Sequence, residues 1–402
     1  MAVYEYIARD DKGTRFSGVY TDVENVRTLK EDLSKMGDML VNARRQKASV
    51  REHKDIHKKI KSDEIIAFAY ELAGMCSAGM SIVKSIETVE NQSENPAFKY
   101  VLSDIRESIE TGSTLRNAFE KHKEVFSAFF VGMIEAGETG GKLSEALEKS
   151  AIYLEKQAEI KRKVKAAFAY PVVVGVLCIA VVTALMLFVI PVFSKLYQQL
   201  RVQLPVPTQA LLHISFVVRE RWWAVLPVIA VCYFLMKWVR RNPYLKAKWD
   251  VFKLNMPIFG RLNRMVVVSN FVRTFTMMVS AGVSLIRALE IASVVANNAK
   301  ISEIAKELER SIETGNPVAA SLKNYDIFPP TIVQLAASGE EAGVLSEMLS
   351  KGVDFLDREI DRVIKSLLLK IEPVMTLIMG AIVGLILTAV YLPMFDYLSH
   401  LK

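Results

Sequence analysis

The chain has 402 residues, of which 51% are hydrophobic and 24% are charged, and its formal net charge is +7. This balance is too apolar for an ordinary soluble protein and too charged for a protein lying wholly in a membrane, so it predicts water-facing domains joined to a few membrane spans. The three cysteines, Cys76, Cys178 and Cys232, form no C-x-x-C motif, which argues against a disulfide framework and a zinc site.

Residues 1–45 predict a small ββαβ element. The stretches YEYIARD and TRFSGVYTD flank a DKG turn and predict a hairpin, ENVRTLKEDLSKMG predicts a helix, and DMLVNARR predicts a strand. No charged-then-apolar leader precedes them, so no cleavable signal peptide is expected.

Residues 46–61 form a basic linker. Its His53 and His57 have the i, i+4 spacing of a helical metal site, but no third ligand is visible, and we expect them to be solvated.

Residues 62–165 predict a first helical domain, because apolar residues recur at helical spacing from Ile65 onward. Breaks at Gly79, Asn95-Pro96, Gly112, near Val125 and at 137–141 divide it into about six helices. The last of these, which begins at Leu143, is expected to run on into a membrane span.

Three stretches predict membrane helices: 166–194, 222–239 and 371–396. Lysine and arginine residues cluster just before 166, after 239 and before 371, whereas 195–221 and 397–402 are poorer in them. Because cytoplasmic flanks carry the excess of basic residues, the N-terminus is expected in the cytoplasm and the C-terminus in the periplasm of a bacterial inner membrane.

An internal repeat relates the two helical regions. FAYELAGMCSAGMSIVKSIETV begins at Phe68 and FVRTFTMMVSAGVSLIRALEIA begins at Phe271, and SIETG occurs at both 108–112 and 311–315. The motif G-E-x-x-G-x-L-S-E-x-L starts at Gly137 and again at Gly339. The chain is therefore two parallel copies of one unit, each a helical domain that runs into a membrane helix, and the second span returns the chain to the cytoplasm.

The glycine-rich stretch EAGETGGKLSEAL, residues 135–147, is not a phosphate-binding loop. A Walker motif would need glycine at the position of Ala136 and serine or threonine at that of Leu143. The second copy, ASGEEAGVLSEML at 337–349, contains no lysine. What the two copies share predicts a turn between helices.

The expected fold is an all-α membrane protein with two repeated cytoplasmic helical bundles of about six helices each, three transmembrane helices and the small N-terminal ββαβ element. The predicted boundaries are 1–45 for the N-terminal element, 46–61 for the basic linker, 62–165 for the first helical domain, 166–194 for the first span, 195–221 for a periplasmic loop, 222–239 for the second span, 240–264 for a basic cytoplasmic linker, 265–370 for the second helical domain, 371–396 for the third span and 397–402 for a periplasmic tail.

This combination resembles the inner-membrane platform protein family of type IV pilus assembly and type II secretion. The resemblance is carried by SAG-x-S turns at 77–81 and 280–284, the two G-E-x-x-G-x-L turns, LPVPTQALL at 204–212 and MPIFGRL at 256–262. It implies a non-enzymatic, oligomeric scaffold without a cofactor. Its expected partners are a cytoplasmic hexameric assembly ATPase, pilin or pseudopilin subunits, other inner-membrane assembly proteins and further copies of itself.

The repeated turns supply the first candidate site. Glu138 and Glu340 either contact a partner or cap the next helix with their carboxylates. The other members are the four glycines Gly137, Gly141, Gly339 and Gly343. Glu135, Glu138 and Glu145 could bind a hard cation, but a solvated face is the simpler interpretation.

The prolines near the span ends supply the second candidate site. They are Pro171, Pro191, Pro373 and Pro393. Each is either a hinge in a membrane helix or a residue that positions a helix end. The basic stretch at 237–264, with Trp238, Tyr244 and Trp249, could contact nucleic acid, but anchoring at the membrane interface explains it, and no nucleic-acid partner is expected.

We compare three functions for such a chain: a scaffold, a transporter and an enzyme. A scaffold that couples an ATPase to pilin movement needs a cytoplasmic domain joined rigidly to membrane helices, and this chain has that arrangement twice. A transporter would favour inverted repeats and ionisable residues within its spans. An enzyme would need a nucleophile with its base, or a set of metal ligands, and neither is visible. Pilus and secretion platforms cannot be told apart at this level, and the pilus is the preferred prediction.

Overall fold

The computed structural model describes residues 2–9, 15–23, 30, 39–46, 60–189, 191–192, 225–257 and 259–399. The chain divides into two compact units. The first unit comprises 1–65 and 81–113, and the second comprises 66–80 and 114–402. Helix α3 (Ser62–Ser77) therefore begins in the first unit and ends in the second.

Three antiparallel strands form a sheet in the first unit. They are β1 (Ala2–Arg9), β2 (Arg15–Val23) and β3 (Met39–Gln46), and β1 is central in the order β2-β1-β3. The three strands lie in the stretches that the sequence predicted as a hairpin and a further strand. The helix expected before β3 falls almost wholly outside the described residues, so the complete ββαβ element stays a prediction.

Helices α4 (Ile82–Gln92) and α5 (Pro96–Glu110) contact each other in the first unit. Each begins at a side-chain cap: the Ser81 hydroxyl accepts a hydrogen bond from Lys84 N–H, and the Asn95 amide oxygen accepts one from Ala97 N–H. The two helices are also joined by an ion pair between Arg106 and Glu90, with Nε and Oε2 2.9 Å apart.

The second unit is helical in the part that the structure describes. Besides most of α3, its helices are α6 (Leu115–Glu120), α7 (Ala128–Gly140), α8 (Leu143–Ala184), α11 (Val225–Arg241), α12 (Pro243–Asn255), α13 (Gly260–Ser280), α14 (Leu285–Ala296), α15 (Ala299–Glu313), α16 (Val318–Lys323), α17 (Pro330–Glu341) and α18 (Leu345–Ser399). Helix α12 lies within the segment predicted as the basic linker.

The repeat is visible in backbone conformation as well as in sequence. The six helices α3 to α8 correspond in order to α13 to α18, which confirms about six helices per copy. Corresponding turns carry glycines in the left-handed region, where a side chain would be strained. The pairs are Gly79 and Gly282 (φ +84° and +84°), Gly112 and Gly315 (+93° and +87°), and Gly141 and Gly343 (+65° and +71°).

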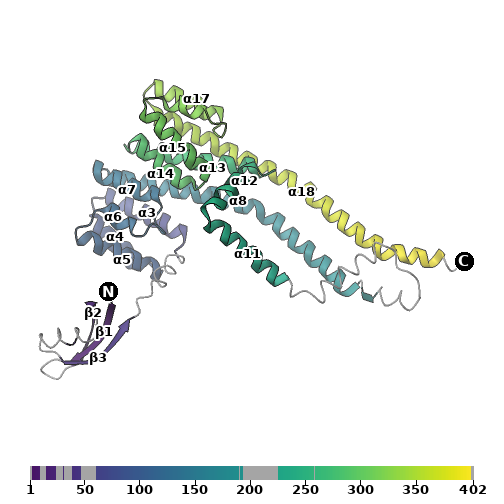
Figure 1. Ribbon diagram of the computed structural model, residues 1–402, viewed down its shortest axis with the longest axis horizontal. Helices are drawn as coiled ribbons and strands as arrows, with labels where there is room; N and C mark the ends of the chain where they lie inside the picture. The colour runs from purple at the N-terminus through teal and green to yellow at the C-terminus, as the bar shows by residue number, and fades with distance from the viewer. Residues whose placement is uncertain are drawn as a thin grey trace. The chain divides into compact units, whose positions relative to one another are not determined.

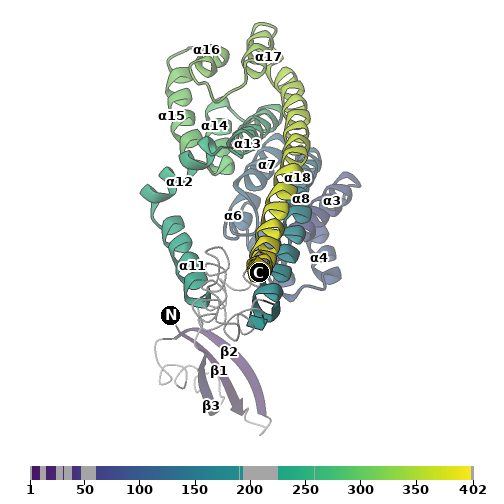
Figure 2. The same ribbon diagram turned by 90° about the vertical axis from the view of Figure 1, so that its right-hand side faces the viewer.

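One hydrophobic core in the second unit joins the two copies. Phe129, Met133 and Tyr153 from the first copy belong to the same buried cluster as Phe271 and Met278 from the second. Helix α7 contacts α13 and α14, and these helices lie together in Figure 2. The contact is close because α7 has a glycine there: a Cβ on Gly132 would lie 2.7 Å from Ile291 Cδ1. The parts of both copies that lie in the second unit therefore share one core.

Helices α8 and α18 contact each other and extend side by side beyond the core helices (Figure 1). Both are long and apolar enough to cross a membrane, and no other helix in the described ranges passes the same test of length and composition. Large apolar side chains on them are exposed, among them Val173 and Leu377. Helix α11 has 17 residues, and the second predicted span, at 222–239, stays a prediction. As predicted, α8 runs from the soluble core into the first span.

The structure corrects one interpretation of the prolines. Pro171 lies inside α8, and Pro373 and Pro393 lie inside α18, so none of the three positions a helix end. The physical reason is that each apolar stretch continues a helix that started 28 residues earlier, at Leu143 before Pro171 and at Leu345 before Pro373. A proline within a helix removes one backbone hydrogen bond. The π-helical turn Leu185–Val189 precedes Pro191. In this turn too, the regular α-helical hydrogen-bond pattern is interrupted.

Candidate functional site

The repeated G-E-x-x-G motif forms the turn between the last two helices of each copy. Gly141 ends α7 and its counterpart Gly343 follows α17, both with left-handed backbone. The Gly137 carbonyl accepts a hydrogen bond from Lys142 N–H at 2.9 Å, and the Gly339 carbonyl accepts one from Val344 N–H at 2.7 Å. These six-to-one bonds are typical of Schellman helix ends. The stretch is thus a helix–turn–helix joint, as predicted.

Gly137 and Gly339 are required for close packing and not for the turn itself. They lie within α7 and α17, where a Cβ on Gly137 would stand 2.7 Å from Ala146 Cβ. A Cβ on Gly339 would stand 2.9 Å from Leu345 Cα. Both glycines therefore let the next long helix cross the last turn of the preceding one.

Glu138 and Glu340 cap helices, but not the helices that were predicted. The Glu340 carboxylate accepts hydrogen bonds from Val318 N–H at 2.7 Å and Ala319 N–H at 3.0 Å. Glu138 accepts one from Leu115 N–H at 3.1 Å. The capped helices are α16 and α6, which precede the turn in sequence, because the turn folds back over their first residues. Each carboxylate satisfies amides that an isolated helix start leaves free.

The three carboxylates considered as a cation site have separate partners. Glu135 forms an ion pair with Arg116 at 2.5 Å, and Glu145 forms one with Lys149 at 2.8 Å. The hydrogen bond from Lys149 lowers the pKa of Glu145 below its ordinary value. Within the described ranges, no group of three or more acidic, histidine or cysteine residues is placed to hold a metal. His53 and His57 lie outside the described residues.

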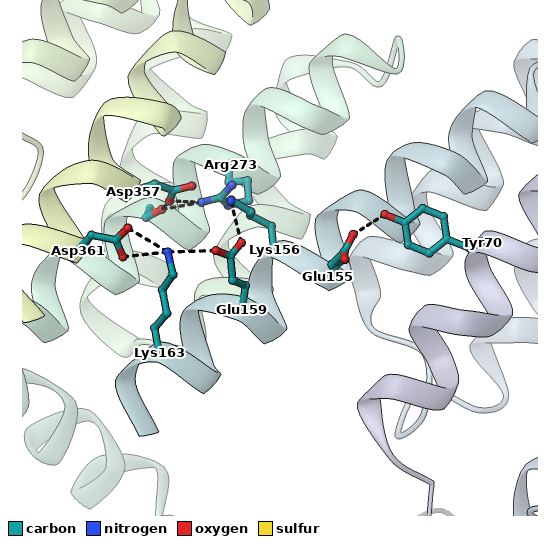
Figure 3. A network of polar contacts seen from close by, with 9 residues as sticks. Tyr70, Glu155, Lys156, Glu159, Lys163, Arg273, Asp357 and Asp361 are labelled. Carbon is teal, nitrogen blue, oxygen red and sulfur yellow. Dashed lines mark hydrogen bonds and ion pairs between the residues drawn. The ribbon is translucent and has the colours of Figure 1, made fainter. Parts of the chain in front are cut away.

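A polar network connects α8 to α18 just ahead of their apolar stretches (Figure 3). The Lys163 ammonium on α8 lies between Glu159, at 3.0 Å, and Asp361 on α18, at 2.9 Å. Lys156 also binds Glu159, at 2.7 Å. The hydrogen bonds that Lys163 donates to Asp361 and Glu159 raise its pKa, and the hydrogen bonds that Glu159 accepts from Lys156 and Lys163 lower the pKa of Glu159. Lys163 and Glu159 are therefore both charged at neutral pH.

A buried ion pair reinforces the same region from α13. Arg273 binds Asp357 on α18, and its Nη2 also donates to the Ser269 hydroxyl at 3.2 Å. The Arg273 side chain is 6% exposed and that of Asp357 is 16% exposed. An ion pair removed from water is sensitive to the loss of either partner, because the remaining charge stays buried.

Tyr153 on α8 makes a polar contact with α13. Its hydroxyl lies 2.9 Å from Thr274 Oγ1 and accepts a hydrogen bond from Gln157 at 2.8 Å. Its ring stacks on Phe129, with centroids 3.7 Å apart. Burial raises the pKa of Tyr153 to about 12. The hydroxyl therefore stays protonated at any physiological pH.

Sequence reasoning missed this set of contacts. Lys156 and Lys163 were attributed only to the basic flank of a membrane span. The signal that could have found them is the placement of Glu159 between those lysines at i+3 and i+4 spacing, matched by Asp357 and Asp361 ahead of the third span. The network joins the two helices just before both become apolar.

The fold and these joints define a class of protein: a duplicated helical membrane protein whose copies share one core and each extend a helix of membrane-spanning length. A family model described as "Type II secretion system (T2SS), protein F" matches residues 68–191 and again 271–393. The chain belongs to this family.

Curated relatives match the chain over most of its length. It is 32% identical to the type IV pilus assembly protein PilC of Thermus thermophilus, with 100% of both chains covered. It is 35% identical to PilC of Myxococcus xanthus over 84% of this chain and 81% of that protein. It is 26% identical to the type II secretion system protein F of Vibrio cholerae, with 98% of each covered.

Proposed function

We propose that this chain is the inner-membrane platform protein of a type IV pilus assembly machine. In that role it couples a cytoplasmic hexameric ATPase to the insertion and extraction of pilin subunits. The observation that carries the proposal is the joint between α8 and α18: both helices leave one packed core, are tied together by Lys163 and Asp361, and continue as apolar helices of membrane-spanning length. A movement of the core would therefore reach the membrane through two continuous helices.

The pilus is favoured over secretion by the relatives. Those named for pilus assembly reach 35% and 32% identity, and those named for secretion reach 29% and 26%. The equivalent platform of a type II secretion system, which would assemble a pseudopilus, is the second candidate, and the name of the family supports it.

The proposed topology has three spans, at 166–194, 222–239 and 371–396. It places the N-terminus in the cytoplasm and both 195–221 and 397–402 in the periplasm. The basic flanks support this orientation, and α11 carries exposed apolar side chains such as Phe234 and Leu235. Single cysteines placed at Ser49 and Ser399 test it: a membrane-impermeant maleimide should label the second from the periplasm and not the first.

The assembly ATPase is proposed to dock on the cytoplasmic helices of 62–165 and 265–370, with copies of this chain associating side by side. The turns that contain Glu138 and Glu340 are candidate contacts with the ATPase, because Glu138 is exposed beside the glycines of its turn. Pro171, Pro191, Pro373 and Pro393 are proposed as hinges. Replacing Pro171 and Pro373 together by alanine should reduce fibre number while leaving the amount of membrane-inserted protein unchanged.

A clean deletion of this chain in its own organism, complemented in trans, tests the function. Surface fibres would be counted by electron microscopy, and culture-supernatant proteins would be compared. We expect fibres to be lost and secretion to continue. Loss of secreted proteins with fibres intact would assign the chain to secretion instead, and no change in either would reject the platform role.

A further inference from the structure

We propose that the second unit contains a binding site for one anionic phospholipid, in a groove of 910 Å³ between α8, α12 and α13. These helices can be followed in Figure 1. The volume is within the range of small-molecule sites in proteins. The inference rests on the proposed membrane location of α8 and is independent of the pilus role.

The charge of the groove points to an anion. Its lining includes Lys161, Lys165 and Lys253, and contains no aspartate or glutamate. Lys253 is paired with Asp250 at 2.9 Å. No ion pair joins Lys161 or Lys165 to any residue within the described ranges. Two lysines therefore line the groove without an ion-pair partner in the part of the chain that the structure describes.

The remaining lining suits a molecule that is both polar and apolar. Ile160, Val164 and Phe168 line one wall along α8, and Phe259 faces Phe168 with ring centroids 5.5 Å apart. Asparagine side chains of α13 and the end of α14 add hydrogen-bonding groups, at Asn263, Asn270 and Asn297. A phosphate next to the lysines would leave acyl chains to follow the apolar wall toward the span.

The position along α8 matches the level of lipid headgroups. The charge-free stretch begins at Ala166, directly after Lys165, and Lys161 is about 6 Å further back than Lys165 at 1.5 Å per residue. The polar layer on each side of a bilayer is about 5–7 Å thick. Helix α12 supplies a second indication of this level, because Trp249 and Phe252 are 40% and 52% exposed and stack on each other. Aromatic residues of this kind are enriched at membrane interfaces, and basic pockets beside membrane helices on the cytoplasmic side bind anionic headgroups.

Native mass spectrometry of the purified full chain, titrated with phosphatidylglycerol or phosphatidylethanolamine, tests the site. The double variant Lys161→Gln/Lys165→Gln should weaken phosphatidylglycerol binding about 10- to 30-fold and leave phosphatidylethanolamine binding unchanged. Lys161→Arg/Lys165→Arg should bind as the wild type does. Lys306→Gln/Lys323→Gln is the matched control, because it removes the same charge from exposed positions on α15 and α16.

Equal weakening in the control variant would overturn the proposal, because it would assign the effect to total charge. Equal binding of the two lipids by the wild type would also overturn it, as would displacement of phosphatidylglycerol by inorganic phosphate or by a glutamate-rich peptide. Because lipid binding is measured on the purified chain, a chain that binds the lipid but is not needed for fibres would refute only the pilus role.

Discussion

Arg273 on α13 and Asp357 on α18 form an ion pair that is almost withdrawn from solvent, with side chains 6% and 16% exposed. The pair joins a helix at the centre of the shared core to a helix that continues as an apolar rod. The Nε of Arg273 is buried and has no hydrogen-bond partner within the described ranges, so Asp357 and Ser269 carry most of the compensation for its charge.

Asp357→Asn should destabilise the protein by about 3–5 kcal/mol, because it leaves the guanidinium buried without a counter-ion. The double variant Arg273→Met/Asp357→Leu should recover much of that loss. Thermal unfolding of the full chain in detergent measures both. Glu303→Gln, in an exposed pair with Lys300, is the control and should cost less than about 0.5 kcal/mol. A double variant no more stable than Asp357→Asn would contradict this account.

Gly137→Ala should destabilise the protein by about 1–3 kcal/mol, because the new methyl group would meet Ala146 Cβ at 2.7 Å. Gly339→Ala should cost at least as much, since its nearest atom is backbone, Leu345 Cα at 2.9 Å. Gly140→Ala is the matched control within the same turn, where a Cβ has nothing within 4 Å, and it should be neutral or slightly stabilising. Equal melting temperatures for Gly137→Ala and Gly140→Ala would refute the close-packing role.

Glu340→Ala should cost about 1–2 kcal/mol and expose the amides of Val318 and Ala319 to faster hydrogen exchange. Glu138→Ala should cost less, because Glu138 caps a single amide, that of Leu115. Hydrogen-exchange mass spectrometry separates capping from partner contact: a pure contact residue would leave these amides protected. Glu341→Ala, at the exposed neighbouring position, should leave the exchange of both peptides unchanged.

The Lys163 network should contribute stability over a defined pH window. The pKa of Glu159 is lowered from its ordinary value of 4.5, so its contribution is complete above about pH 4.5 and is lost as pH falls through the lowered value. The pKa of Lys163 is raised from 10.5, so its contribution is complete below that value and is lost as pH rises through the raised one.

Lys163→Met should therefore lower the melting temperature by a constant amount between about pH 6 and 9, and by less in acid below 4.5. The effect should stay under about 1 kcal/mol, because the Lys163 and Glu159 side chains are 41% and 40% exposed. Differential scanning fluorimetry across pH measures the difference. A gap that widens in acid would mean that another group carries the pH dependence.

The repeat, the helix count and the joint at residues 137–143 could be predicted because they depend on local signals. Glycines mark the turns, helical spacing marks the helices, and a charge-free stretch marks each span. The partners of Glu138 and Glu340 could not be predicted, because each bond closes a loop of 22 or 23 residues whose geometry depends on the whole copy. Nor could the contact of Gly132 with Ile291, since nothing in the sequence states that two copies will share one core. The helix-end alternative for Pro171, Pro373 and Pro393 was wrong, because the pattern marks where charge ends and not where a helix begins.

The continuity of α8 has a consequence for which residues face the lipid. The helix runs without interruption for 42 residues from Leu143, a length of about 60 Å. Each residue rotates the helix by 100° about its axis. Inserting one residue between Lys163 and Pro171 would therefore rotate the whole apolar end by that angle. The turn at Gly141 and the contacts that follow it in the water-facing core therefore determine which side chains of the membrane segment point toward the lipid.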